Sequence, residues 1–135
     1  MKRHDWTHHL YEQIDSHLHR SFVWGDNDCC LFAARVVDAM CDSDHEMALR
    51  EKYQDEASAL EYISRSGGIA PAVDEFIGSH KVEGRPMRGD VVLFDGANGE
   101  TLGICAGRYV AAMGADGVVF ADRPKVICYW SIQDA

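Results

Sequence analysis

The residues best suited to chemistry are an aspartate and two adjacent cysteines at the start of a helical pattern. Asp28 is a good N-cap residue, so Cys29 and Cys30 are predicted to occupy the first helical turn. The unpaired N–H groups and the positive end of the helix dipole favour an anion there, and a thiolate is an anion. A cysteine in this position can have a pKa well below its free value of about 8.5. Cys29 is therefore the candidate nucleophile.

A structural role for Cys29 is an equally open interpretation, because cysteine is among the most buried residue types. Cys105 and Cys128 fall on predicted strands, which is consistent with a thiol-rich core. Neighbouring residues of a helix project in different directions, so Cys29 and Cys30 are not expected to point the same way. A zinc site made by Cys29 or Cys30 with Cys105 and Cys128 is a third alternative, but it lacks a paired Cys-x-x-Cys motif.

The composition indicates one ordinary globular domain over residues 1–135, with 47% hydrophobic and 26% charged residues. The net charge of −9 argues against sequence-independent binding of nucleic acid and against binding to an anionic membrane surface. No run approaches the roughly 18 apolar residues of a membrane span, and no secretory signal is visible. We expect a protein made and left in a cytoplasm, or delivered with an assembly, with its five cysteines reduced.

The elements that position these residues form a helical half, residues 1–80, and a sheet half, residues 81–135. Apolar residues recur at helical spacing over residues 6–18, 28–40, 51–65 and 69–77. The second of these segments is apolar on most sides, so we expect it to be a buried central helix. Past Gly84 the period changes, and five strands are predicted over residues 89–94, 101–106, 109–113, 117–121 and 126–132. This order indicates an α+β fold, with the helices on one face of an antiparallel meander.

Two further groups of residues could suggest a metal site, but their spacing favours solvated surfaces. His4 and His8 are spaced i, i+4 without a third ligand, so the five histidines on or near the first helix are interpreted as a polar face. The acidic segment 42–46 lacks the glycine and glutamate of a calcium loop, so it is interpreted as a turn with helix-capping carboxylates. We expect no metal and no cofactor.

Three motifs in order resemble the NlpC-type papain-like cysteine peptidases. In that family a Tyr-x-Trp-Gly-Gly approach leads to Asp-Cys-Ser-Gly at the start of a central helix, and residues 22–32 read FVWGDNDCCLF. The family's Gly-Asp-Leu-Val-Phe-Phe strand is matched by residues 89–94, and its His-Val-Gly-Ile-Tyr-x-Gly strand by residues 101–107. The likeness covers residues 22–121 and is closest to an uncharacterised branch frequently encoded in phage and prophage tail modules. It implies a papain-like core.

The resemblance also implies where the general base should stand. The family histidine corresponds to Thr101, and the polar residue that orients it corresponds to Ala111. Cleaving an amide requires a proton delivered to the leaving amine, normally by histidine. Threonine has no accessible pKa for this task, and alanine orients nothing. The cysteine is therefore matched while the base and its orienter are not.

Two hypotheses follow. The first is a degenerate NlpC-like domain that kept the fold and lost the triad, and that serves as a structural or assembly protein of a phage-type tail, with protein partners and a place in the virion. The second is a thiol hydrolase of the peptidoglycan peptidase or amidase type, with Cys29 as nucleophile and a relocated base at His45, His80 or an N-terminal histidine. A peptidoglycan peptide is a partner only under the second hypothesis.

Overall fold

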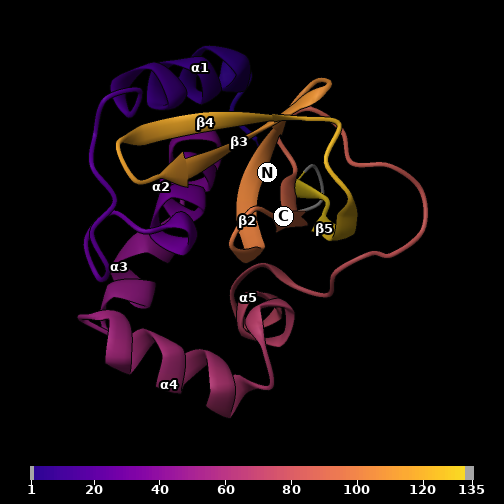
Figure 1. The fold of residues 1–135 in the computed structure, drawn as a ribbon. Coiled ribbons are helices and arrows are strands. Elements are labelled where there is room, and N and C mark those ends of the chain that lie inside the picture. The colour runs from indigo at the N-terminus through magenta and orange to yellow at the C-terminus, as the bar shows by residue number, and fades with distance from the viewer. Residues whose placement is uncertain (1, 133–135) are drawn as a thin grey trace.

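The fold places a group of helices against a single antiparallel sheet (Figure 1). It is a computed structural model that describes residues 2–132. The helices are α1 (Trp6–Ser16), α2 (Cys29–Cys41), α3 (His45–Arg50), α4 (Glu56–Ser66) and α5 (Ile69–Ile77). The strands are β1 (Val91–Gly96), β2 (Gly99–Ala106), β3 (Tyr109–Gly114), β4 (Gly117–Asp122) and β5 (Val126–Trp130). The predicted α+β class is confirmed.

The sheet has the strand order β4-β3-β2-β1-β5, and every neighbouring pair is antiparallel. Strands β1 to β4 form the predicted meander. The prediction is wrong for β5, which returns to the far side of β1 instead of continuing beyond β4. At that edge Trp130 is buried and its indole N–H donates to the Asp74 carboxylate of α5 at 2.8 Å. A long-range contact therefore decides where the last strand pairs.

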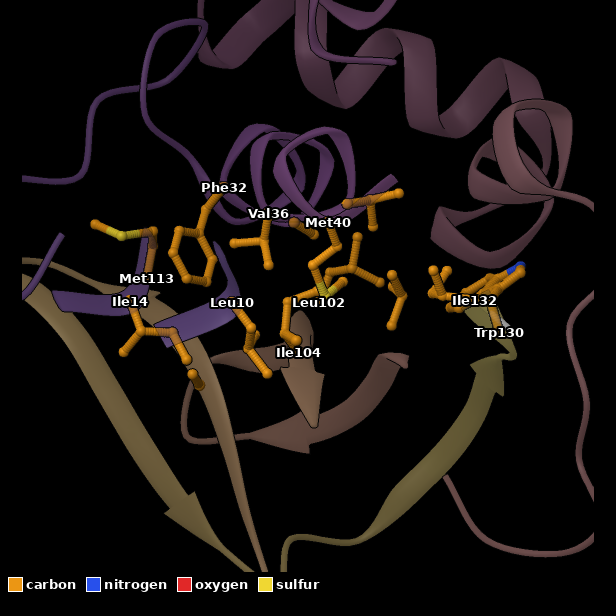
Figure 2. Packing of buried hydrophobic residues seen from close by; sticks show 14 of the residues in the cluster. Leu10, Ile14, Phe32, Val36, Met40, Leu102, Ile104, Met113, Trp130 and Ile132 are labelled. Atoms are coloured by element: carbon orange, nitrogen blue, oxygen red, sulfur yellow. The ribbon is translucent and has the colours of Figure 1, made fainter. Parts of the chain in front are cut away.

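The main core lies between α1, α2 and one face of the sheet. Figure 2 shows Phe32, Val36 and Met40 of α2 directed toward the side chains of Leu102 and Ile104 on β2. Alternate residues of a strand point to opposite faces, which explains why only every second residue of β2 reaches these helices. The expected buried central helix is α2, six of whose residues are buried.

None of the helices within residues 2–132 combines the length and the apolar character that a bilayer-crossing helix needs.

The segment after α2 differs from the sequence prediction. Residues 42–46 were expected to be a solvated turn, but α3 begins at His45. The carboxylate of Asp38, on α2, accepts hydrogen bonds from the backbone N–H groups of His45 at 2.8 Å and Glu46 at 2.9 Å. These bonds satisfy two N–H groups that the first turn of α3 leaves unpaired. The start of α3 is thus stabilised by a side chain on α2. The local spacing of residues 42–46 does not predict this interaction.

The helix predicted over residues 51–65 begins later in the structure than in the prediction. The expected helix over residues 51–65 is α4, which starts at Glu56. Its N-cap is Asp55, whose side chain accepts from the Ser58 backbone N–H at 2.9 Å while the Ser58 hydroxyl contacts the Asp55 backbone N–H at 3.1 Å. This capping box ends the preceding turn and defines the start of the helix.

One histidine of the predicted polar face is buried. His17 follows α1 and is 1% exposed, so the prediction of a solvated side chain is wrong for this residue. Its Nδ1 lies 2.7 Å from the Gln13 carbonyl, and its Nε2 lies 2.8 Å from a guanidinium nitrogen of Arg35. A guanidinium only donates, so Nε2 accepts and Nδ1 carries the proton. Burial lowers the pKa of His17 and keeps the ring neutral.

Replacing Leu10 by alanine tests whether α1 belongs to the same core as α2 and the sheet. Leu10 is fully buried in the main cluster, so Leu10→Ala should lower the free energy of unfolding by about 2–5 kcal/mol. Leu60→Ala is the matched control, because Leu60 is 53% exposed on α4 and its loss should cost no more than about 0.5 kcal/mol. Urea denaturation measures both values. Equal effects of the two substitutions would contradict the position of α1 in the core.

Candidate active site at the start of α2

Asp28 is a fully buried carboxylate that holds the turn before α2 in place. It accepts hydrogen bonds from the backbone N–H of Leu31 at 2.9 Å and of Gly25 at 3.0 Å. The hydroxyl of Tyr53 donates to the same carboxylate at 2.9 Å. A buried charge is tolerated when it is fully hydrogen-bonded, and these donors meet that requirement. Asp28 is the N-cap of α2, and both of its carboxylate oxygens accept structural hydrogen bonds.

Gly25 allows the turn before α2 to lie against the backbone of Gln54. Its φ is +82°, and a Cβ atom there would lie 2.1 Å from the carbonyl oxygen of Gln54. Any other residue would push the turn away from the segment that carries Tyr53. The bond between Tyr53 and Asp28 therefore depends on a glycine at position 25.

Cys29 is the first residue of α2, and its half-buried thiol lies beside the thiol of Cys30 and the backbone of Leu102 on β2. The hydrogen bond from Cys30 is the largest cause that lowers the pKa of Cys29, and the Leu102 backbone lowers it further. Burial and the nearby Asp28 charge act in the opposite direction. The pKa of Cys30 is raised well above its usual value because this thiol donates to Cys29 and is itself buried.

Thr101 and Ala111 lie on opposite faces of the sheet. Thr101 is half-buried, pairs with Phe94 of β1, and its hydroxyl donates to the Gly99 carbonyl at 3.1 Å. Ala111 is fully buried opposite Ile104 and belongs to the core beneath the helices. Because Phe94 belongs to the cluster on the other face, Thr101 projects away from α2. These two positions supply neither a proton-transfer group nor a common surface.

Of three histidines considered as relocated bases, His17 and His80 are hydrogen-bonded to groups away from Cys29. His17 bonds Gln13 and Arg35, as described above. The Nδ1 of His80 lies 3.0 Å from the Asp74 carboxylate, and its ring packs edge-on against Trp130. His45 packs edge-on against Phe76 and lines an apolar pocket that Cys30 also borders. Of the three, only His45 shares a cavity with one of the two thiols.

The cysteines do not gather into a metal site. Cys128 belongs to the core under the helices, whereas Cys105 belongs to the cluster on the other face of the sheet. Within residues 2–132, no three histidine, cysteine or acidic side chains are arranged to hold a metal ion. The five cysteines are free thiols. The zinc alternative fails because the sheet separates its proposed ligands.

Comparison with known proteins identifies the family but no activity. The sequence model of a domain of unknown function, DUF6950, matches residues 1–132. This chain belongs to the DUF6950 family. No curated protein matches it. Interpretation of Cys29 in this DUF6950 protein therefore depends on the geometry of its own residues.

Three partners in the site of this DUF6950 chain were missed from the sequence. Tyr53 was assigned to an apolar helical stripe, yet its hydroxyl reaches a carboxylate 25 residues earlier in the chain. Leu102 was assigned to a strand, and its backbone contact with Cys29 exists only once β2 packs on α2. The third is Cys30, whose adjacency to Cys29 was visible but whose effect on the pKa of Cys29 was not. No local signal identifies the first two.

Removing the Asp28 carboxylate should destabilise the protein strongly. Asp28→Ala leaves two backbone N–H groups and the Tyr53 hydroxyl without their acceptor in a buried turn. We expect a loss of about 2–4 kcal/mol in the free energy of unfolding. Asp55→Ala, at the exposed N-cap of α4, is the control and should cost less because water replaces its bonds. Guanidinium denaturation measures both, and an equal or smaller loss for Asp28→Ala would refute the anchoring role.

The contact between the two thiols predicts a pH effect on alkylation. Only the thiolate reacts, so a lowered pKa moves the onset of Cys29 alkylation by iodoacetamide to lower pH. Cys30→Ala removes the donor that stabilises the thiolate and should move the midpoint to higher pH. Cys41→Ala, at the other end of α2, should leave it unchanged. Mass spectrometry of the Cys29 peptide gives the profile, and an unchanged midpoint in Cys30→Ala would exclude the contact as the cause.

Proposed function

We propose that this protein is an NlpC-like domain without peptidase activity that serves as a structural or assembly component of a phage-type tail. One observation carries the proposal: Cys29 stands at the start of α2, while the sequence positions that the resemblance assigns to the base and its orienter hold Thr101, which projects away from α2, and Ala111. Neither side chain can move a proton. The proposed role requires the fold but no peptidase activity.

The surroundings of Cys29 support a structural role for the turn. The Asp28 carboxylate ties together the turn, the first residues of α2 and the segment that precedes α4. A catalytic site would leave a proton acceptor within reach of the thiol. Here the groups that lower the pKa of Cys29 are chiefly another thiol and the backbone of Leu102. Such contacts can stabilise a thiolate, but they deliver no proton to a leaving amine.

Charge and surface support protein partners for the proposed tail role. The net charge of −9 disfavours nucleic acid, and the uncharacterised branch that the motifs resemble is frequently encoded in phage and prophage tail modules. In the part of the chain that the structure describes, β4 forms one edge of the sheet and exposes Val119 and Phe120. An edge strand with apolar side chains is suited to pairing with another chain. We place the protein in the cytoplasm when made and in the virion after assembly.

Genetic complementation tests the proposal in the phage or prophage that encodes the protein. Deleting the gene should abolish tailed particles in electron micrographs, and a Cys29→Ser copy should restore them as fully as the unaltered gene. Purified protein should cleave peptidoglycan peptides no faster than the Cys29→Ser variant. Normal tails without the gene, or restoration that requires the cysteine, would refute the proposed role.

The lowered pKa of Cys29 favours a second candidate function. In this alternative the protein is a thiol hydrolase acting on an amide of the peptidoglycan type, with Cys29 as nucleophile. His45 would be the relocated base, since it lines the same pocket as Cys30. Peptidoglycan peptide cleavage that is lost in both Cys29→Ser and His45→Ala, but retained in His80→Ala, would support the hydrolase in place of the tail component.

A further inference from the structure

His17 lies directly after α1, with its ring buried against α2. The ring is 1% exposed and packs edge-on against Phe32, with centroids 5.1 Å apart. Its Nδ1 carries the proton, as described above, and lies 2.7 Å from the Gln13 carbonyl. Its Nε2 accepts hydrogen bonds from two guanidinium groups, that of Arg35 at 2.8 Å and that of Arg20 at 3.2 Å. Both ring nitrogens of the neutral form are therefore used.

A second proton on His17 would face positive charge. It would sit on Nε2 and point at the two guanidinium groups, which donate hydrogen bonds but accept none. The nearby acid is Glu46 on α3, whose carboxylate already accepts from Arg35 and from Arg50 at 3.0 Å each. Burial is the largest cause that lowers the pKa of His17, and the charges of Arg35 and Arg20 lower it further. The carbonyl bonded to Nδ1 and the Glu46 charge act in the opposite direction.

The backbone of His17 contacts the strand at one edge of the sheet, β4. The His17 carbonyl accepts from the Val118 backbone N–H at 3.1 Å, and the Phe22 backbone N–H donates to the Ala115 carbonyl at 3.0 Å. With these two bonds, residues 17–22 lie along the turn between β3 and β4 and cover the first part of β4. Because the ring and the carbonyl belong to the same residue, movement of the ring out of its site also moves the acceptor of Val118.

We propose that His17 is a pH-sensitive switch: uptake of a second proton releases its ring from the core, and residues 17–22 then detach from β4 and leave the Val118 N–H free. The released imidazolium is solvated by water instead of facing two guanidinium groups. Because the pKa of His17 is lowered in the closed form, the open form binds more protons. The closed form is therefore fully stabilised above the ordinary histidine pKa of about 6.5, and this stabilisation is lost as the pH falls through the lower pKa of the closed form. The switch belongs to the isolated chain, so it does not depend on the proposed tail role.

Amide hydrogen exchange of the full chain measures the opening. Between about pH 7.5 and about pH 5.5, the protection factor of the Val118 amide, corrected for intrinsic exchange, should fall about three- to tenfold, because the open form takes up one more proton. The Cys105 amide on β2, which donates to the Asp90 carbonyl at 2.8 Å, should keep its protection factor because residues 17–22 do not cover it. An unchanged protection factor at Val118, or an equal fall at Cys105, would overturn the proposal.

Two glutamine variants assign the effect to one ring. His17→Gln keeps an oxygen that can accept from Arg35 but cannot take up a proton, so the fall at Val118 should disappear. His19→Gln is the matched control, because His19 is exposed in the same segment, and the fall should remain. A fall that persists in His17→Gln would refute the switch. If His17→Gln does not fold, NMR titration of the His17 ring in the unaltered protein decides: its midpoint should lie below about pH 6.5 and coincide with the change at Val118, and a midpoint at or above that value would refute the switch.

Discussion

The arrangement around Cys29 depends on one buried carboxylate. Asp28 has no solvent contact, and its negative charge is compatible with burial only because backbone N–H groups and the Tyr53 hydroxyl point at it. Each of these donors comes from a different part of the chain: the turn, the first turn of α2 and the segment before α4. The carboxylate therefore fixes the direction in which α2 leaves the turn. The buried residues of α2 therefore depend on this N-cap for their positions in the core.

A second buried carboxylate plays a comparable role in the sheet half. Asp90, directly before β1, accepts from the backbone N–H of Met87 at 2.8 Å and of Ile132 at 3.1 Å. It joins the entrance of the first strand to the chain that follows the last strand. Asp28 anchors the start of the helix that carries Cys29, and Asp90 anchors the start of β1, which pairs with β2 and β5. Since both are consumed by structural bonds, neither is available as an acid or a base.

The surroundings shift the pKa values of the two adjacent thiols in opposite directions. The Cys29 thiol and burial raise the pKa of Cys30, whereas the Cys30 thiol lowers the pKa of Cys29. No histidine is among the chief causes that lower the pKa of Cys29, so stabilisation of a thiolate there is separate from proton delivery. Proton delivery is what amide hydrolysis additionally requires.

The sequence alone determined the α+β class, the helix that begins at Asp28 and Cys29, and the strands β1 to β4. Their signals are local, since capping and hydrophobic period act between residues a few positions apart. Only the tertiary structure decided that Asp38 starts α3, that β5 returns to β1, and that His17 is buried. It also decided that the Tyr53 hydroxyl bonds the Asp28 carboxylate. These outcomes arise from hydrogen bonds and packing between distant segments, whose energies appear only after the chain has folded.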